Sequence, residues 1–329
     1  MKRKTLEYLI CPACLPEEKP ISLRHRRNAG EEIIEGVLEC DSCKKAYTIN
    51  RGVARLTAGK DAGYRVSGIG NQTPDTKGAR PDSTSVYESP ALLSAYLWSH
   101  YADLFEDPDA TGAYSEWAAQ ISPAAGAALD AGCATGRFSF EMSHKCDFVI
   151  GVDLSESFIS MARLILEERK LNFRIKEEGL IHSERTFVLP AHWDSRKVEF
   201  IVADINALPF RSGSFSCVVS LNLIDKIARP LGHVGEASRT ARFAGAQLLI
   251  SDPFSWSEQV CAPDRWLGGT PSGRFAGAGI DNIIRLLSEE EGLASPAWRI
   301  AGRGAVWWKI RNHRNHFELI RSLFVKAER

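Results

Sequence analysis

The segment 127–137 constrains the fold of this chain more than any other. Residues 127–130 read AALD and predict a short buried strand, and a turn with the sequence AGCATG follows, up to Gly136. A helix is expected from about Arg137. Gly132 and Gly136 allow the backbone to pass close to a ligand, where a β-carbon would collide. A strand, a glycine turn and a helix in this order are typical of a nucleotide-binding α/β sheet.

The rest of the chain after residue 86 continues this alternation of strands and helices. Further strands are expected at 148–153, 198–204, 215–221 and 246–250, and Ser155 is expected to cap a helix that runs to about Lys170. Segments 298–300 and 305–310 are expected to form a closing antiparallel pair, and 312–329 a basic amphipathic helix. The pattern predicts an α/β, Rossmann-like doubly wound sheet with an antiparallel edge.

The glycine turn has two possible interpretations, each a known type of nucleotide-binding loop. A dinucleotide fold requires G-x-G-x-x-G, whereas here Asp130 leads the turn and Ala134 stands where a middle glycine is expected. About 20 residues further on, Asp153 ends the second strand, where a carboxylate binds the two ribose hydroxyls. The alternative is that Asp153 and Asp204 are ordinary surface carboxylates at strand ends.

The turn resembles motif I of class I methyltransferases, (D/E)-x-G-x-G-x-G, in the variant D-x-G-C-A-x-G. The resemblance implies that S-adenosylmethionine is the cofactor and that Asp204, which closes the third strand, binds the adenine amino group. The implied cofactor-binding residues are Asp130, Gly132, Cys133, Ala134, Gly136, Asp153, Leu154, Asp204, Ile205 and Asn222. Many enzymes that methylate exocyclic base amines or glutamine amides carry (N/D/S)-P-P-(Y/F) after the fourth strand. The sequence NLID at 222–225 argues against those substrates.

Four of the eight cysteines form two tight pairs, Cys11/Cys14 and Cys40/Cys43. Each C-x-x-C turn directs two thiolates at one ion, and two such turns complete the tetrahedron that Zn²⁺ accepts. All four positions would be filled, which predicts a structural zinc ion and no open catalytic position. The alternative, a pair of redox dithiols, would not require two C-x-x-C motifs.

The cysteine-containing segment resembles the Trm112-like family of zinc-binding modules. The resemblance rests on LICP at 9–12 and on Cys43 followed by YTI at 47–49 and by Gly52 and Val53. Members of that family often dock on methyltransferases and activate them, so the resemblance implies a module fused in cis.

Three regions are therefore predicted: a zinc ribbon over 1–58, a flexible linker over 59–85, and a methyltransferase domain over 86–329 that ends in a basic helix. The linker segment is rich in Gly, Ser, Thr, Asp and Pro. No apolar stretch is long enough to span a bilayer. The apolar run after Lys4 is interrupted by Glu7, too short for a secretory signal, so we expect a cytoplasmic protein.

Residues 86–310 more narrowly resemble the methyltransferase domain of ovothiol-biosynthesis enzymes, which methylates an imidazole nitrogen of 4-mercaptohistidine. The shared segments are YES at 87–89, Tyr96-Leu97 leading to His100-Tyr101, DAGCATGR at 130–137, EEG at 177–179, Leu189-Pro190, NLID at 222–225, Ser255-Trp256 and WLGG at 266–269. The sulfoxide synthase part of those enzymes is absent, and the 312–329 tail is extra. The resemblance therefore implies a related small-molecule methyl acceptor without fixing its identity.

Methyl transfer requires orientation and a dry pocket, and it requires a base only when the acceptor arrives protonated. His100 is the candidate base or substrate hydrogen-bonding group, with Tyr101, Asn222 and Asp225 as further catalytic candidates. Trp256 and Trp266 are expected to line the pocket, because indole faces suit both a sulfonium and an aromatic ring. The alternative is that His100 is a surface histidine whose hydrogen bonds are satisfied and that both tryptophans are core residues.

The formal net charge is zero, but the basic residues are concentrated at both ends. Residues 1–60 carry 12 Lys and Arg against 8 Asp and Glu, and residues 296–329 carry 8 against 2. Basic ends leave open an RNA methyltransferase that binds its substrate through the ribbon and tail, whereas the acidic middle disfavours nucleic acid. A third possibility is a methyltransferase-like partner protein without activity. No membrane partner is expected.

Overall fold

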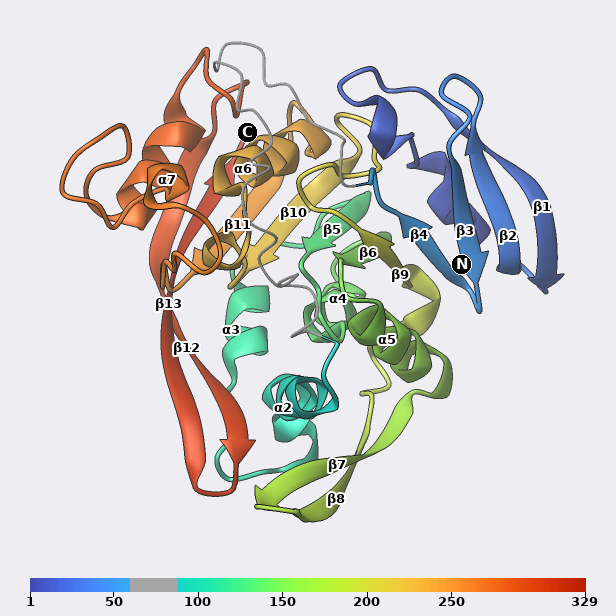
Figure 1. Ribbon diagram of the computed structural model, residues 1–329, viewed down its shortest axis with the longest axis vertical. Coiled ribbons are helices and arrows are strands. Elements are labelled where there is room, and N and C mark those ends of the chain that lie inside the picture. The colour runs from blue at the N-terminus through green and yellow to red at the C-terminus, as the bar shows by residue number, and fades with distance from the viewer. Residues whose placement is uncertain (60–87) are drawn as a thin grey trace.

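The computed structural model describes residues 1–59 and 88–329. These residues form a single 11-stranded mixed sheet and a separate two-stranded hairpin, as Figure 1 shows. The order of the large sheet is β1-β2-β3-β4-β9-β6-β5-β10-β11-β13-β12. Of the predicted linker over 59–85, only Gly59 is among the described residues. Tyr87 also lies outside them.

The first four strands belong to the cysteine-containing module and are β1 (Ile21–Ala29), β2 (Glu32–Cys40), β3 (Ala46–Asn50) and β4 (Val53–Leu56), preceded by the short helices η1 (Arg3–Glu7) and η2 (Pro12–Cys14). They pair antiparallel in chain order. Strand β4 then pairs in parallel with β9, with Arg55 opposite Val202 and Leu56 opposite Ala203. The module therefore extends the main sheet instead of forming an independent unit.

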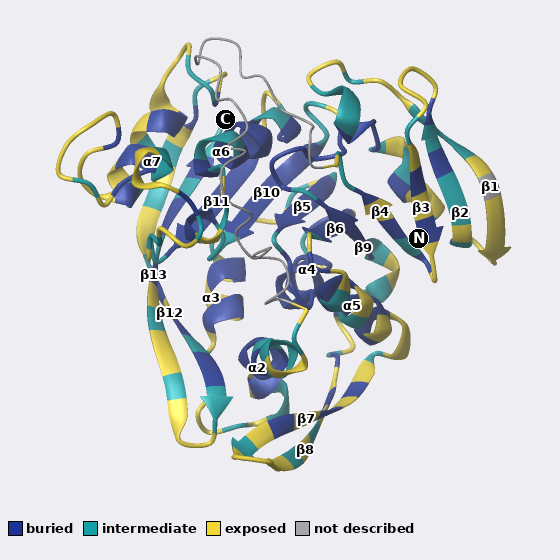
Figure 2. Cartoon of the chain, in the orientation of Figure 1, coloured by how far each residue is buried: buried dark blue, intermediate teal, exposed yellow. Residues whose placement is uncertain are grey.

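The centre of the sheet consists of parallel strands β9 (Val198–Ala203), β6 (Phe148–Asp153), β5 (Ala127–Ala131), β10 (Phe215–Leu221) and β11 (Gln247–Asp252). Nearly every residue of these strands is buried, as expected for a parallel sheet covered on both faces. Figure 2 shows this buried centre. All five strands were predicted from the sequence, and the Rossmann-like α/β class is confirmed.

The C-terminal prediction was wrong in two respects. Residues 299–300 and 305–310 belong to one strand, β12 (Arg299–His313), and the expected helix over 312–329 is instead its antiparallel partner, β13 (His316–Glu328). Strand β13 lies between β11 and β12 and pairs antiparallel with both. The backbone groups on the free edge of β11 require hydrogen-bond partners, and β13 supplies them. The predicted antiparallel edge is confirmed, with different strands.

Helices cover both faces of the sheet. One face is covered by α2 (Pro90–Tyr101), α3 (Ala113–Ala119), α4 (Arg137–Met142) and α5 (Glu156–Glu168), and the other by α6 (Pro230–Thr240), α7 (Gly279–Ser288) and the N-terminal module. Ser155 caps α5 by accepting a hydrogen bond from the Phe158 amide, as predicted. Short helices η3 (Ala102–Phe105), η4 (Ser195–Lys197), η5 (Ile224–Lys226) and η6 (Pro263–Arg265) lie in the connections. Within the described ranges, no helix is long and apolar enough to cross a bilayer.

The insert between α5 and β9 forms a hairpin of β7 (Lys170–Glu178) and β8 (Ile181–Val188). In Figure 1 this hairpin lies beyond α2, near the connection between β12 and β13. The Arg314 amide donates to the Glu177 carbonyl at 3.1 Å, which joins the two hairpins.

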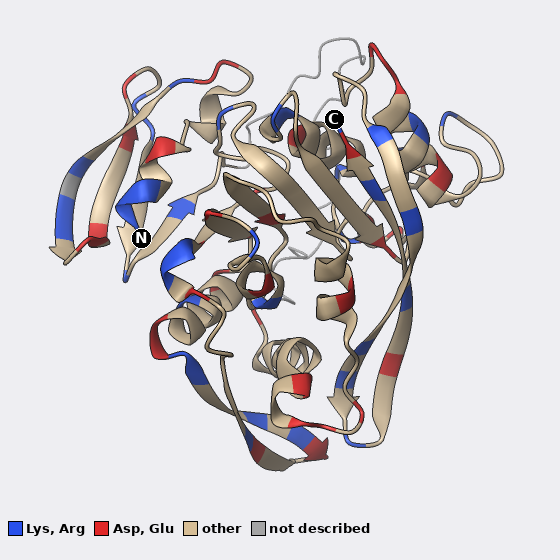
Figure 3. Cartoon of the chain, turned by 180° about the vertical axis from the view of Figure 1, so that it is seen from behind, with Lys and Arg blue, Asp and Glu red and all other residues tan. Residues whose placement is uncertain are grey.

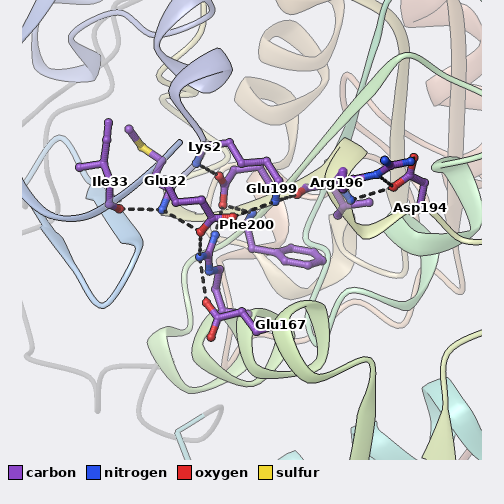
Figure 4. Close-up of polar contacts among 11 residues, drawn as sticks. Lys2, Glu32, Ile33, Glu167, Asp194, Arg196, Glu199 and Phe200 are labelled. Carbon is purple, nitrogen blue, oxygen red and sulfur yellow. Dashed lines mark hydrogen bonds and ion pairs between the residues drawn. The ribbon is translucent and has the colours of Figure 1, made fainter. Parts of the chain in front are cut away.

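A buried ion cluster joins the cysteine-containing module to the main sheet (Figure 4). The Arg163 guanidinium, from α5, contacts Glu199 of β9 at 2.7 Å and Glu32 of β2 at 2.7 Å. Glu199 is fully buried and also accepts hydrogen bonds from the Lys2 and Phe200 amides. Removal of one partner from such a cluster leaves a buried charge uncompensated, which typically costs about 3–5 kcal/mol. The two parts of the chain are therefore mutually stabilising.

Candidate functional site

A cavity of about 340 Å³ lies at the carboxyl ends of β5, β6, β9 and β10. Ligands bind at this edge in open α/β sheets because the connecting loops leave a crevice there. Its walls come from the turn after β5, from the ends of the neighbouring strands, and from α2, α3 and β12. The lining residues are Tyr96, His100, Tyr114, Asp130, Gly132, Cys133, Ala134, Phe138, Asp153, Leu154, Ser155, Phe158, Asp204, Ile205, Asn206, Leu221, Asn222, Leu223, Lys226, Ile227, Ala228, Arg229 and Trp308.

The glycine turn forms one wall through its backbone. The amides of Gly132 and Cys133 donate to the Val152 carbonyl at 2.8 and 2.9 Å, so the turn is tied to the end of β6. Gly132 has φ +82°, and a β-carbon there would lie 2.7 Å from the Leu223 side chain. Ala134 also has a positive φ, +44°, and it lines the cavity. Glycine is therefore required at position 132 by both conformation and space.

Gly136, a predicted cofactor-binding residue, has a packing role in this structure. It does not line the cavity, although it was expected to bind cofactor. A β-carbon at this position would meet the Phe200 ring at 2.4 Å, and its φ is +87°. Gly136 therefore permits the helix α4 to begin directly against β9, which is a packing requirement.

Three carboxylates lie at the strand ends beside the turn. Asp153 accepts hydrogen bonds from the Ala134 and Ser155 amides at 3.0 and 2.9 Å, and desolvation in the cavity raises its pKa to about 6. Asp130 accepts from the Ser139 hydroxyl at 2.7 Å, and burial raises its pKa to about 7. Asp204 accepts from the Asn206 amide at 2.8 Å and lies 3.9 Å from the Arg229 guanidinium. The structure places all three on one cavity, with Cys133, Leu154 and Ile205 between them.

His100 lines the same cavity from α2 and is buried, so it is not a surface histidine. Its Nδ1 atom lies 3.0 Å from the Thr135 hydroxyl. Burial, assisted by the nearby Arg137 guanidinium, lowers the pKa of His100 to about 3. The imidazole is therefore neutral near pH 7. It can form hydrogen bonds to a ligand, and its low pKa makes it a weak general base.

Tyr101 and Asp225 do not line the cavity, contrary to their predicted catalytic roles. Tyr101 is the next residue after His100 on a helix, so its side chain points in another direction. Its hydroxyl donates to the Thr135 carbonyl at 2.7 Å, and its ring stacks on Phe187.

Asp225 is buried behind the wall and accepts from the Ser255 amide at 2.8 Å. Burial and the Asp225 carboxylate raise the pKa of the neighbouring Asp252 to about 8.

The two tryptophans expected in the pocket pack against each other instead. Trp256 and Trp266 stack with ring centroids 6.2 Å apart, and the Trp266 indole N–H donates to the Cys261 carbonyl at 3.1 Å. Neither lines the cavity. Asn222 does line it, with φ +54°, and its side-chain oxygen accepts from the Ser322 hydroxyl at 2.5 Å.

The sequence did not identify the aromatic wall around His100. Tyr96 and Tyr114 have ring centroids 5.7 and 4.6 Å from that of His100. Phe158 and Trp308 lie beyond Tyr96, at 4.9 and 6.1 Å. The spacing of Tyr96 and His100, four residues on one helix, was a usable signal, because such residues share a face. No local signal marked Tyr114 or Trp308.

Tyr114 contributes a polar group as well as a ring. Its side chain is 8% exposed and lines the cavity. Its hydroxyl has no hydrogen-bond partner among the residues that the structure describes, and neither has the Nε2 atom of His100. Both atoms are available to a bound molecule at the aromatic end of the cavity.

The four N-terminal cysteines form a separate cluster. Their sulfur atoms lie within 4.8 Å of one another, with Cys11–Cys43 at 3.6 Å and Cys14–Cys40 at 3.7 Å. A tetrahedron of thiolates around Zn²⁺, with Zn–S bonds of about 2.3 Å, has edges of about 3.8 Å. The donor set and its spacing therefore fit a closed, tetrahedral metal site.

Two protein families match parts of the chain. Residues 129–249 match the methyltransferase domain family, and residues 2–52 match the Trm112p-like protein family. Over 266 residues the chain is 24% identical to an uncharacterized chloroplastic methyltransferase of Arabidopsis thaliana, a match that covers 76% of this chain. The match spans 64% of that relative's length.

Two solved structures are similar in fold. A complex of the Haloferax volcanii Trm112 methyltransferase activator with a methyltransferase is 13% identical, covers 76% of this chain and 99% of the other, and has a TM-score of 0.46. Magnesium protoporphyrin IX methyltransferase from Synechocystis, with bound S-adenosylmethionine, is 13% identical, with coverage of 77% and 99% and a TM-score of 0.44. Both TM-scores are low, so the fold assignment rests on the sheet topology and the family matches.

The family matches support the methyltransferase resemblance over residues 129–249 and the Trm112-like resemblance over residues 2–52. None of these relatives tests the finer resemblance to the methyltransferase domain of ovothiol-biosynthesis enzymes.

The pKa of His100 predicts a specific pH dependence of stability. Its pKa is about 3 in the folded chain and about 6.5 in the unfolded chain, so between these values only the unfolded chain binds the proton. The contribution of neutral His100 to stability is therefore lost as the pH falls through 6.5. The unfolding free energy of the unmodified chain should therefore fall between pH 7 and pH 5. In His100→Gln we expect this fall to be smaller by about 2 kcal/mol.

Urea unfolding of both proteins at pH 7 and pH 5 measures this difference. An identical pH dependence in His100→Gln and in the unmodified chain would show that His100 is not buried in its neutral form.

Proposed function

We propose that this chain, whose residues 129–249 match a methyltransferase domain, transfers a methyl group from S-adenosylmethionine to a small-molecule acceptor. The observation that carries the proposal is the cavity in which the glycine turn, three strand-end carboxylates and an aromatic wall meet. The acceptor that we propose is an imidazole or another histidine-derived nitrogen heterocycle, in line with the resemblance of residues 86–310.

The cavity has two ends with different chemistry. At one end, the turn at 132–134 and the carboxylates of Asp153 and Asp204 would hold the nucleoside part of the cofactor. Asp153 is fixed by two backbone amides and retains lone pairs for ribose hydroxyls. Asp130 also lines the cavity, and the hydrogen bond that it accepts from the Ser139 hydroxyl ties the end of β5 to α4.

At the other end, His100 and Tyr114 face the cavity among aromatic rings. When bound, S-adenosylmethionine supplies a methyl group on an activated sulfonium, so the chain mainly has to orient the acceptor and exclude water. The Tyr114 hydroxyl and the His100 Nε2 atom would position the acceptor by hydrogen bonds, and Tyr96 and Trp308 would enclose its ring. Neutral His100 serves better as an orienting group than as a strong base.

Nucleic acid is the less favoured acceptor. The basic C-terminal segment is a pair of strands, and four of its cations are paired: Arg299 and Lys326 with Glu328, Lys309 with Asp109, and Arg311 with Glu177. In the cartoon of Figure 3, basic and acidic residues are interspersed along the chain. No specific observation favours an RNA acceptor over a small molecule.

We further propose that Cys11, Cys14, Cys40 and Cys43 hold a structural Zn²⁺ ion. Two of the four cysteines, Cys11 and Cys40, are buried, and the set is closed, so the site has no position for a substrate. Strand β4 of the cysteine-containing module pairs with β9, and Asp204 directly follows β9. The metal would therefore stabilise the strand that positions Asp204.

The first test is methyl transfer from S-adenosylmethionine to histidine, 4-mercaptohistidine and a short RNA panel. We expect turnover of an imidazole compound and none of RNA. In Tyr114→Phe, loss of one hydrogen bond should raise the acceptor KM about three- to tenfold, and cofactor affinity should not change.

Tyr101→Phe is the matched control, because its hydroxyl bonds to the Thr135 carbonyl away from the cavity. We expect this variant to retain the acceptor KM. Preferential methylation of RNA, or equal effects of the two tyrosine variants, would overturn the small-molecule proposal.

The zinc site is tested by metal analysis of the purified chain. About one zinc ion per chain is expected, and its removal by a strong chelator should lower the melting temperature, because the ligand set would lose its central ion. Cys43→Ser should contain less zinc, whereas Cys146→Ser, outside the cluster, should contain as much as the unmodified chain. A metal-free preparation whose stability does not respond to Cys43→Ser would contradict the proposal.

A further inference from the structure

A second cavity, of about 470 Å³, lies on the other side of α2 from the cavity described above. It is bounded by the first half of α2, by β7 and β8, and by the end of β12. Its lining residues are Pro90, Ala91, Ser94, Ala95, Trp98, Arg174, Ile175, Lys176, His182, Arg311 and Asn312. No Asp or Glu is among these described lining residues, although the set contains two arginines, a lysine and a histidine.

The cations of this lining differ in whether their charge is compensated. Arg311 is buried and donates to the Lys176 carbonyl and to Glu177, both at 2.7 Å, so its charge is balanced. Arg174 and Lys176 are exposed, and among the described residues their side chains have no hydrogen-bond or ion-pair partner. Two cations without an ion-pair partner among the described residues therefore lie two residues apart on one strand.

The hairpin carries carboxylates close to these cations in the strand register, but none of the described ones forms an ion pair with Arg174 or Lys176. Glu177 accepts from Ser183, Arg185 and Arg311. Glu184 lies opposite Arg174 in the strand register and accepts from the Asn172 amide at 3.3 Å. Neither forms an ion pair with Arg174 or Lys176.

The start of α2 adds a further positive contribution. This helix has 12 residues, and its first residues, Pro90 and Ala91, line the cavity. Ser89 accepts from the Leu92 amide, and Pro90 has no N–H, so the cap leaves the Ala91 amide without a helical partner. The partial positive charge of a helix N-terminus adds to that of the side chains and favours an anion.

We propose that this second cavity binds a small organic anion, with a phosphate or carboxylate group held by Arg174 and Lys176. Ala95, Trp98 and Ile175 form its apolar side, which suits a ligand with an apolar body next to the charged group. The site is separate from the proposed methyl-transfer cavity, and it does not depend on that function. Both cavities share α2, which presents Ser94 and Trp98 to one and Tyr96 and His100 to the other.

Calorimetric titration of the full chain with phenyl phosphate, benzoate and inorganic phosphate tests the proposal. We expect saturable binding of phenyl phosphate or benzoate, and the stronger of the two identifies the anionic group. Inorganic phosphate should bind more weakly than phenyl phosphate, because it has no apolar body.

The decisive variant is Arg174→Gln with Lys176→Gln. Both side chains are exposed, so the fold should be retained, and loss of two charge-assisted contacts should weaken binding by at least about tenfold. Lys170→Gln with Arg303→Gln is the matched control, since it removes the same charge from exposed positions outside the cavity. Equal weakening in both double variants, or the absence of saturable binding to the unmodified chain, would overturn the proposal.

Discussion

Strand β9 is the element on which the two parts of the chain depend. One of its edges pairs with β6 and the other with β4 of the cysteine-containing module. Its Glu199 holds Arg163 in the buried cluster, and its Phe200 fills the space left by Gly136 and Gly151. The strand then ends one residue before Asp204, at the cavity. Loss of the module would expose an edge of the strand that positions this carboxylate, so the module supports the site through the sheet.

The positions of the central strands could be predicted because each strand is determined by its own local sequence. Each is a short apolar run, and four of them have a carboxylate at or next to the carboxyl end: Asp130, Asp153, Asp204 and Asp252. The last strand could not be predicted in this way. The apolar residues of 316–328 fit the periods of both a helix and a strand, and only the free edge of β11, which is distant in sequence, selects the strand.

The site was predictable to the extent that its parts are close in sequence. The turn at 130–136 and the acid about 20 residues later have a fixed geometric relation, and the structure places most of these residues on the cavity. The aromatic wall is assembled from α2, α3, α5 and β12, so no local pattern indicated Tyr114 or Trp308. Tyr101 lies off the cavity because adjacent helical residues point about 100° apart, and Tyr96 shares the face of His100. The rings of Trp256 and Trp266 stack on each other in a loop outside the cavity, and the sequence carried no signal of this contact.

Calorimetric binding of S-adenosylmethionine to the full chain tests most directly whether the turn and the acids at the strand ends form a site for that molecule. We expect binding with a stoichiometry of about one, and an affinity at least about tenfold lower in Asp153→Asn, because this variant lacks the charge that would receive the ribose hydroxyls. Asp109→Asn, an exposed carboxylate outside the cavity, should bind as the unmodified chain does. No binding, or equal binding by the unmodified chain and both variants, would contradict the assignment of this cavity.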